Sequence, residues 1–247
     1  MFLKKHIPNS LTLLNLLSGL LAILALFIGK LEYLPWLLAL SLLADFLDGL
    51  VARALHVSSP IGKELDSLAD MVSFGVLPGL LMLYLSARAY FHMQDTKEFL
   101  SIFENIHSFS EAFIIFFPLI ISLFSALRLA KFNVATNQSK EFMGLATPAA
   151  TLLVLGLFVN ERNEFFESSF IYNSISLNII SIVIAILLIS NLPMFSFKLG
   201  KFSWQEHKWQ IIFVLSAIVL LIFFKLAALA LIVLVYILIN LLRKAIS

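Results

Sequence analysis

Long apolar segments, separated by short polar joints, follow one another along almost the whole chain. They lie at about residues 11–28, 34–55, 62–87, 112–132, 147–159, 174–192, 209–224 and 226–242. A helix needs about 20 apolar residues to cross the hydrocarbon core of a bilayer. Only 13% of the residues are charged, which is about half the share in soluble proteins. The sequence therefore predicts an all-α, polytopic integral membrane protein with about eight transmembrane helices.

The basic residues predict the orientation of these spans. An even number of spans leaves both ends of the chain on one side of the membrane, and all but five of the 17 Lys and Arg residues then fall on that side. The exceptions are Lys30, Arg88, Lys97, Arg162 and Lys225. Cytoplasmic loops of membrane proteins carry the excess of Lys and Arg. We therefore expect a multi-pass protein of the cell membrane with both termini in the cytoplasm.

Several classes of site are excluded by composition. The chain contains no cysteine, so it has no disulfide, zinc–thiolate site or iron–sulfur cluster. Its five histidines are scattered without metal-ligand spacing.

The first apolar run follows Lys4 and Lys5 and lacks a small-residue cleavage site, so we interpret it as a membrane helix and not as a signal peptide. We predict no nucleic-acid partner.

Four aspartates stand out within this apolar chain. Asp45 and Asp48 are three residues apart, and Asp66 and Asp70 are four apart, so each pair lies on one face of a helix. A short turn separates the two helices, which brings both pairs to the cytoplasmic side. A carboxylate in a membrane segment is costly unless it is paired, hydrated or bound to metal. Facing pairs would form an all-oxygen pocket that suits Mg²⁺ or Mn²⁺.

The residues around these aspartates form a pattern with fixed spacing. It reads D-x-x-D-G-x-x-A-R, eight residues, then G-x-x-x-D-x-x-x-D, and resembles the signature of the CDP-alcohol phosphatidyltransferase family. The matching residues are Asp45, Asp48, Gly49, Ala52, Arg53, Gly62, Asp66 and Asp70. Eight fixed positions are far more specific than a lone glycine-rich triplet. The resemblance implies a six-helix catalytic core over residues 1–192, followed by a pair of transmembrane helices over residues 193–247.

Three further stretches look like the phosphatidylserine synthase branch of that family. They are DMVSFGVLP at 70–78, RLAKFN at 128–133 and GLATPAA at 144–150, in which Lys131 and Ala146 depart from the more usual Arg and Pro. The resemblance implies transfer of a phosphatidyl group from CDP-diacylglycerol to the hydroxyl of L-serine, giving phosphatidylserine and CMP. Glycerol 3-phosphate or inositol phosphate stays open as the acceptor, because Lys63, Arg128, Lys131 and Lys140 could bind a further phosphate. Family members are commonly homodimers, so we expect a homodimer in the lipid bilayer.

The resemblance also implies roles for single residues. The four aspartates would bind two divalent cations, and Asp70 would also be the general base that takes the proton from the acceptor hydroxyl. Gly49 would let the diphosphate approach closely, and the Arg53 guanidinium suits a phosphate oxygen. The residues expected to bind CDP-diacylglycerol are Asn9, Thr12, Gly49, Arg53, Ser59 and Gly62. Those expected near the acceptor are Ser73, Arg128 and Lys131.

Each of these residues has a plainer interpretation as well. The aspartates could line the cation or proton pathway of a transporter, although such a pathway does not need Gly, Ala and Arg at these offsets. Basic residues at helix ends often only set the topology, and membrane glycines often only serve helix packing. A lone Asn before a helix is usually its cap, and a lone Ser in a turn is usually a turn residue.

Overall fold

The computed structural model of the chain is built almost wholly of helices. It describes residues 2–57, 59–93, 99–134, 142–163, 170–195 and 204–246, so that Lys140 lies outside the described residues. The α-helices are α1 Phe2–Phe27, α2 Leu34–Ala54, α3 Pro60–Asp70, α4 Leu77–Phe91, α5 Ile102–Asn105, α6 Phe109–Phe116, α7 Ile120–Val134, α8 Thr147–Asn163, α9 Ser174–Ile189, α10 Trp204–Phe224 and α11 Ala228–Ile246. Short 3-10 turns are η1 Leu31–Tyr33, η4 Phe117–Leu119 and η5 Lys225–Ala227, and η2 Met71–Val76 is a π-helical turn.

Each apolar segment of the sequence corresponds to a helix or to a continuous helical stretch. Five such stretches within the described residues are long and apolar enough to cross a membrane: His6–Phe27, Leu31–Ala54, Pro60–Phe91, Phe109–Val134 and Lys208–Ala245. The last contains α10 and α11, which meet at Lys225, where φ is +49°. Helices α8 and α9 have 17 and 16 residues. The all-α polytopic membrane class is confirmed, whereas the number of eight crossings stays a prediction.

Local sequence signals explain where several helices begin and end. The Ser59 hydroxyl caps α3 by accepting the N–H of Gly62 at 2.9 Å, and Pro60 occupies the first helical position. Ser108 and Glu111 form a capping box at the start of α6. Gly29, with φ of +74°, follows α1 and allows the tight return into α2.

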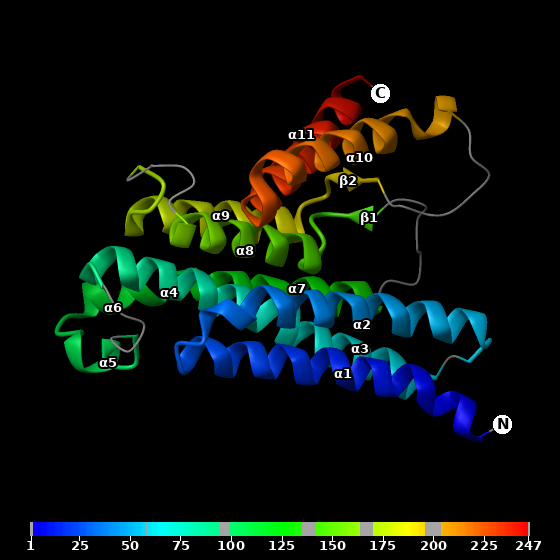
Figure 1. Ribbon diagram of the computed structural model, residues 1–247, viewed down its shortest axis with the longest axis horizontal. Coiled ribbons are helices and arrows are strands. Elements are labelled where there is room, and N and C mark those ends of the chain that lie inside the picture. The colour runs from blue at the N-terminus through cyan, green and yellow to red at the C-terminus, as the bar shows by residue number, and fades with distance from the viewer. Residues whose placement is uncertain are drawn as a thin grey trace.

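The helices form an elongated bundle in which α1 packs against α2, and α7 packs against α9 (Figure 1). The end of α2, the start of α3 and the end of α7 lie toward the end of the bundle where the chain begins. The ends of α4 and α8 lie at the opposite end. Fully buried apolar side chains, among them Phe74, Leu81, Tyr84 and Phe158, fill the space between these helices.

A very short antiparallel sheet joins two connections of the bundle. Strand β1 (Phe142–Met143) pairs with β2 (Pro193–Met194), with Phe142 opposite Met194. Gly144, with φ of +75°, follows β1, and its N–H donates to the carbonyl of Leu192 at 2.9 Å. The sequence does not predict these strands. Each has only two residues, too few to show the alternation of apolar and polar residues that marks a strand, and their pairing depends on how α8 and α9 pack.

The C-terminal helices form a hairpin on the side of the bundle away from α1 (Figure 1). Helix α11 packs against α8, where Gly156 lacks the Cβ that would overlap the backbone of Ala230. Near its other end, the Asn240 side chain accepts the N–H of Phe195, and the Tyr236 hydroxyl donates to the Phe195 carbonyl, both at 2.9 Å. The hairpin is therefore fixed to the core at both ends of α11.

Candidate active site

The turn between α2 and α3 brings the two aspartate pairs together. Asp45 and Asp48 lie in the last turns of α2, and Asp66 lies in α3, which starts at Pro60 under the cap of Ser59. One carboxylate oxygen from each of Asp45, Asp48 and Asp66 lies within 4.8 Å of the others. The helical spacing in the sequence thus correctly predicts that the two faces meet. We call Asp45, Asp48 and Asp66 the aspartate cluster.

Asp70 lies one turn beyond Asp66 and belongs to the same electrostatic environment. Its carboxylate interacts electrostatically with Asp45 and Asp66, but it is outside the group of three whose oxygens lie within 4.8 Å. Its Oδ1 accepts a hydrogen bond from Asn15 Nδ2 at 3.1 Å. The fourth carboxylate is therefore held at the edge of the aspartate cluster by a neutral donor.

The aspartate cluster has negative charge without a matching positive charge. Asp48 is 6% exposed, and none of the four aspartates has an ion-pair partner within the described part of the chain. Asp66 Oδ1 is buried and has no hydrogen-bond partner among the described residues. Carboxylates placed so closely repel one another, and burial increases the repulsion. An all-oxygen donor set with an oxygen left unsatisfied fits a hard divalent cation, so the cluster could hold a metal ion.

Polar residues of α1 hold the carboxylates in place. Thr12 Oγ1 donates to Asp48 Oδ2 at 2.5 Å. The Asn15 side chain is fully buried, accepts a hydrogen bond from the Ser41 hydroxyl, and so turns its amide nitrogen toward Asp70. Thr12 was predicted to contact the nucleotide, whereas Asn15 and Ser41 were not predicted to belong to the site. Thr12, Asn15 and Ser18 recur every three residues on an apolar helix, which is the signal that could have indicated a polar inner face.

The π-helical turn η2 begins directly after Asp70. Ser73, within this turn, is fully buried and donates to the backbone carbonyl of Asn15 at 3.1 Å. A Cβ at Gly19 would overlap Ser73, so this glycine lets α1 approach η2 closely. The hydroxyl expected near the acceptor is thus engaged in packing between α1 and η2. Single-turn π-helices often occur at functional sites.

Three of the residues expected to bind CDP-diacylglycerol gather near the start of α3. A Cβ at Gly62 would lie 3.0 Å from Ser59 Oγ and 3.1 Å from Asn9 Oδ1, so these three residues are close neighbours. A Cβ at Gly49 would meet only Arg53, at 3.5 Å, which leaves space beside that guanidinium. The Ser59 hydroxyl caps α3 as well, in agreement with its plainer interpretation.

The two basic residues expected near the acceptor have different surroundings. Arg128 interacts electrostatically with Asp70, and its Nη1 donates to Thr147 Oγ1 at 3.4 Å. Its Nε is buried without a hydrogen-bond partner among the described residues. Lys131, one turn later in α7, is exposed. The structure therefore brings Arg128 to the aspartates, whereas Lys131 lies at the surface.

The neighbours of Asn133 and of Arg128 near the acceptor region were not predicted. Asn133, at the end of α7, donates from Nδ2 to the Ser67 hydroxyl at 2.8 Å, and its carbonyl accepts from Lys63 Nζ at 2.9 Å. These bonds tie α7 to α3. On the other side, Tyr236 of α11 lies in the neighbourhood of Arg128. The C-terminal hairpin therefore lies near this arginine.

Comparisons with known proteins agree with the sequence pattern. The family model described as CDP-alcohol phosphatidyltransferase matches residues 5–192. The chain is 33% identical over 165 residues to the CDP-diacylglycerol–serine O-phosphatidyltransferase of Helicobacter pylori (strain ATCC 700392 / 26695), which covers 66% of this chain and 61% of that protein. It is 32% identical over 172 residues to the Bacillus subtilis (strain 168) protein of the same name, covering 70% and 80%.

A third relative carries a different name. The chain is 33% identical over 176 residues to an archaetidylserine synthase of Methanothermobacter thermautotrophicus, which covers 69% of this chain and 65% of that protein. The matched part of the chain thus spans less than two thirds of the length of the Helicobacter and Methanothermobacter relatives.

Proposed function

Because the chain belongs to the CDP-alcohol phosphatidyltransferase family, we propose that it transfers the phosphatidyl group of CDP-diacylglycerol to the hydroxyl of L-serine, giving phosphatidylserine and CMP. The observation that carries this proposal is the unneutralised aspartate cluster with Asp70 held at its edge. The names of the relatives, which refer to serine transferases or an archaetidylserine synthase, support serine as the acceptor. Family membership removes the support for a cation or proton transporter.

The aspartates would bind the cations on which this chemistry depends. Asp45, Asp48 and Asp66, joined by Asp70, would hold Mg²⁺ or Mn²⁺, with two ions to a site. Bound ions would neutralise the diphosphate and fix its position. The buried and unsatisfied Oδ1 of Asp66 supports this assignment, since a carboxylate oxygen in an apolar surrounding needs a partner.

Asp70 would act as the general base of a direct displacement. Its carboxylate takes the proton from the serine hydroxyl, and the hydroxyl oxygen forms a bond to the phosphorus that carries the diacylglycerol. The bond from this phosphorus to the bridging oxygen of the diphosphate breaks, and CMP leaves with the electron pair. No covalent intermediate with the protein is required. The hydrogen bond from Asn15 leaves the other Asp70 oxygen available for the proton, which supports this role.

The remaining residues would bind the two substrates. Asn9, Ser59 and Gly62, gathered at the start of α3, would contact the nucleotide together with Thr12. The open space at Gly49 would admit a phosphate group beside Arg53. Arg128, with a buried Nε and Asp70 nearby, is suited to the carboxylate of serine.

The acceptor is the most open part of the proposal. Glycerol 3-phosphate or inositol phosphate would use the same displacement but would need more positive charge around the site. The exposed side chain of Lys131 is available for such a role, whereas Lys63 already donates to Asn133. We propose serine as the acceptor, Ser73 and Lys131 as secondary contributors to its binding, and a homodimer in the cytoplasmic membrane with the site and both termini facing the cytoplasm.

An acceptor panel tests the proposal. Purified protein in detergent receives CDP-diacylglycerol with Mn²⁺ or Mg²⁺, then L-serine, glycerol 3-phosphate, inositol 1-phosphate or choline in turn, while CMP release is followed. We expect metal-dependent release with serine alone. CMP release with another acceptor would leave the proposed site unchanged but would replace serine as the acceptor. Protein that is folded by circular dichroism but releases CMP with none of them would overturn the proposal.

A further inference from the structure

A second polar site lies at the end of the bundle opposite the aspartate cluster. A cavity of about 210 Å³ opens between the ends of α4 and α8 and the segment that leads into α9. Its walls include Leu85, Arg88, Ala89, His92, Glu161 and Tyr172. None of these residues takes part in the proposed transfer reaction. We call this space the Arg88 cavity.

The distance along one helix places the Arg88 cavity at the far face of the membrane. Residues 60–91 form one continuous helical stretch that contains both Asp70 and Arg88. The 18 residues between them correspond to about 27 Å along the axis, which is close to the thickness of the hydrocarbon core of a bilayer. If the aspartates lie at one membrane interface, Arg88 lies at the other.

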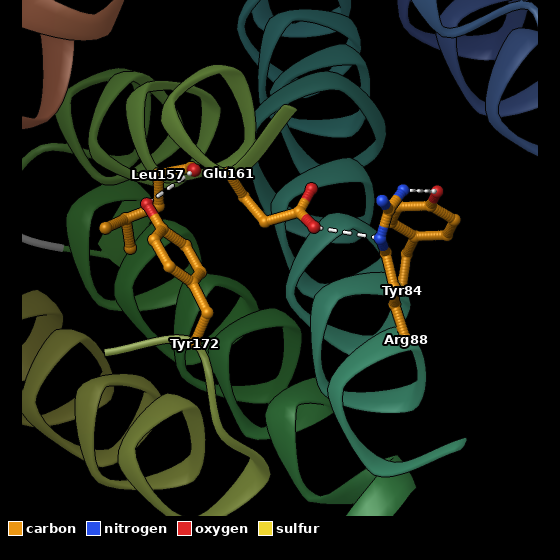
Figure 2. Close-up of polar contacts among 5 residues, drawn as sticks. All are labelled: Tyr84, Arg88, Leu157, Glu161 and Tyr172. Carbon is orange, nitrogen blue, oxygen red and sulfur yellow. Dashed lines mark hydrogen bonds and ion pairs between the residues drawn. The ribbon is translucent and has the colours of Figure 1, made fainter. Parts of the chain in front are cut away.

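An ion pair forms the polar side of the cavity. Arg88 Nε and Glu161 Oε1 are 2.8 Å apart, with side chains that are 31% and 16% exposed (Figure 2). Arg88 Nη1 also donates to the Tyr84 hydroxyl at 3.3 Å. The Tyr84 ring is fixed in turn by Phe99 and Phe158, at centroid distances of 5.2 and 6.0 Å. The guanidinium is thus held in place before any ligand arrives.

Arg88 keeps hydrogen-bonding capacity. A guanidinium has five N–H donors, and two of those of Arg88 are used by Glu161 and Tyr84 within the described structure. The remaining donors suit a phosphate, which arginine binds through parallel hydrogen bonds. Glu161 Oε2 is buried, so an ammonium group would approach Glu161 at Oε1, which accepts from Arg88 and has a second acceptor position.

Tyr172 closes the cavity and does not compete for the ligand. Its hydroxyl donates to the Leu157 carbonyl at 3.0 Å (Figure 2). The same hydroxyl accepts from Asn160 Nδ2 at 2.7 Å. Burial raises the pKa of the Tyr172 phenol above its ordinary value, and the nearby Glu161 adds to the rise, so the hydroxyl keeps its proton. The polar groups offered to a ligand are therefore one cation and one anion.

The rim of the cavity contains a strained residue. His92 follows α4 in the left-handed backbone conformation, with φ of +53°, and its N–H donates to the Arg88 carbonyl. A non-glycine residue in this conformation costs free energy and often marks a functional site. Apolar Leu85 and Ala89 lie beside it on the cavity wall.

We propose that the Arg88 cavity binds the phosphoethanolamine headgroup of a lipid from the leaflet opposite the active site, with the phosphate on Arg88 and the primary ammonium on Glu161. The adjacent cation and anion match a zwitterion of this kind. The apolar wall would face the glycerol and the first carbons of the acyl chains. A headgroup without a primary ammonium lacks the hydrogen bonds to Glu161, and the carboxylate of a phosphoserine headgroup would be repelled by Glu161.

Native mass spectrometry of the full-length protein in non-ionic detergent tests the proposal. The probes are phosphatidylethanolamine, phosphatidylcholine, phosphatidylglycerol and phosphatidylserine with identical acyl chains, and water-soluble glycerophosphoethanolamine. We expect one phosphatidylethanolamine to bind about tenfold more tightly than each of the other lipids, because the others lack the hydrogen bonds to Glu161 or carry a carboxylate that Glu161 repels. Equal binding of all lipids would overturn the headgroup assignment. If water-soluble glycerophosphoethanolamine binds as tightly as the lipid, the claim that the ligand is a membrane lipid is wrong.

Two variants and a matched control locate the binding. Arg88→Gln removes the cation, and Ala89→Leu fills the cavity while leaving the ion pair intact; both should lower the affinity for phosphatidylethanolamine about tenfold. Arg162→Gln removes the same charge from an exposed position next to Glu161 and should leave the affinity unchanged. Thermal unfolding without added lipid reports whether each variant is folded. A folded Ala89→Leu protein that still binds the lipid with full affinity would refute the site.

Discussion

The two ends of the bundle handle buried charge in opposite ways. At the cytoplasmic end of the proposed topology, the aspartate cluster gathers like charges without an ion-pair partner among the described residues. At the other end, Arg88 and Glu161 neutralise each other at 2.8 Å. A bound cation would stabilise the first arrangement by reducing the repulsion, whereas the second is nearly balanced by itself. The difference indicates which end depends on a bound ion and which end can tolerate an empty site.

The same stretch, residues 60–91, contributes to both ends. Its first part places Asp66 and Asp70 against α1 and α2, and its last part places Arg88 against α8. Changing single charges at each end should therefore have effects of opposite sign on stability, although the residues lie in one helical stretch.

The largest effect should follow from removing the proposed general base. Asp70→Asn keeps the shape of the side chain and its acceptor oxygen for Asn15 but cannot take a proton. We expect CMP release to fall about 100- to 10,000-fold, the usual contribution of general base catalysis. Glu32→Gln, an exposed carboxylate outside the site, is the matched control and should keep full activity. Near-normal turnover by folded Asp70→Asn protein would assign the base to another residue.

The next largest effect should be the stabilisation of the aspartate cluster by a bound divalent cation. Mn²⁺ at 100 times its dissociation constant should stabilise the wild-type protein by about 2.7 kcal/mol, and a chelator should reverse this. Asp66→Asn should lose most of this stabilisation. Without metal, the same variant should unfold at a higher temperature than the metal-free wild type, because one repelling charge is gone. Thermal unfolding with and without Mn²⁺ measures the stabilisation by metal and the stability of the metal-free proteins. If metal-free Asp66→Asn protein is less stable than the metal-free wild type, the aspartates do not destabilise the empty site by repulsion.

A smaller effect should follow from loosening one carboxylate. Thr12→Val keeps the shape of the side chain but removes the hydroxyl that donates to Asp48. We expect the affinity for Mn²⁺, measured by electron paramagnetic resonance, to fall about tenfold, as is usual when a ligand loses its orienting hydrogen bond. Ser18→Ala is the control on the same helix, because that hydroxyl donates to Leu14 of its own backbone. Equal losses in both variants would indicate a general disturbance of α1.

The smallest effect is expected at the end of the bundle where Arg88 and Glu161 form an ion pair. Glu161→Gln should lower the free energy of unfolding by about 1 kcal/mol, because the pair is partly exposed and its partner can be hydrated. The double variant Arg88→Gln with Glu161→Gln should lose less than the sum of the two single variants. A double-mutant cycle by thermal unfolding gives the coupling. A stabilised Glu161→Gln protein would show that this end, too, is electrostatically frustrated.

The sequence predicts the aspartate site better than its surroundings. Helical spacing brings Asp45, Asp48 and Asp66 together, and the fixed offsets of Gly49, Arg53 and Gly62 identify the family, because these relations are local. The sequence does not predict Asn15 and Ser41 as site residues, because their roles depend on how α1 packs against α2 and α3. The assignment of metal, base and substrate contacts to single residues stays a prediction, as does the division of the chain at residue 192.

Long-range pairings could not be obtained from local patterns. Arg88 and Glu161 fall in segments that the sequence marks only as polar connections, and their contact requires α4 and α8 to end side by side. The pairing of β1 with β2 likewise joins residues about 50 positions apart. Tyr236 and Arg128, which lie near each other, likewise belong to helices far apart in the sequence. Helix α11 packs against α8 where Gly156 lacks a Cβ.

The π-helical turn η2 determines the angular phase of the helix that contains it. Asp70 and Arg88 are 18 residues apart, which in an unbroken α-helix is five full turns and would point both side chains in the same direction. A single π turn acts like one inserted residue and rotates everything beyond it by about 100°. Residues 71–76 therefore let one transmembrane segment face α1 at one membrane surface and α8 at the other.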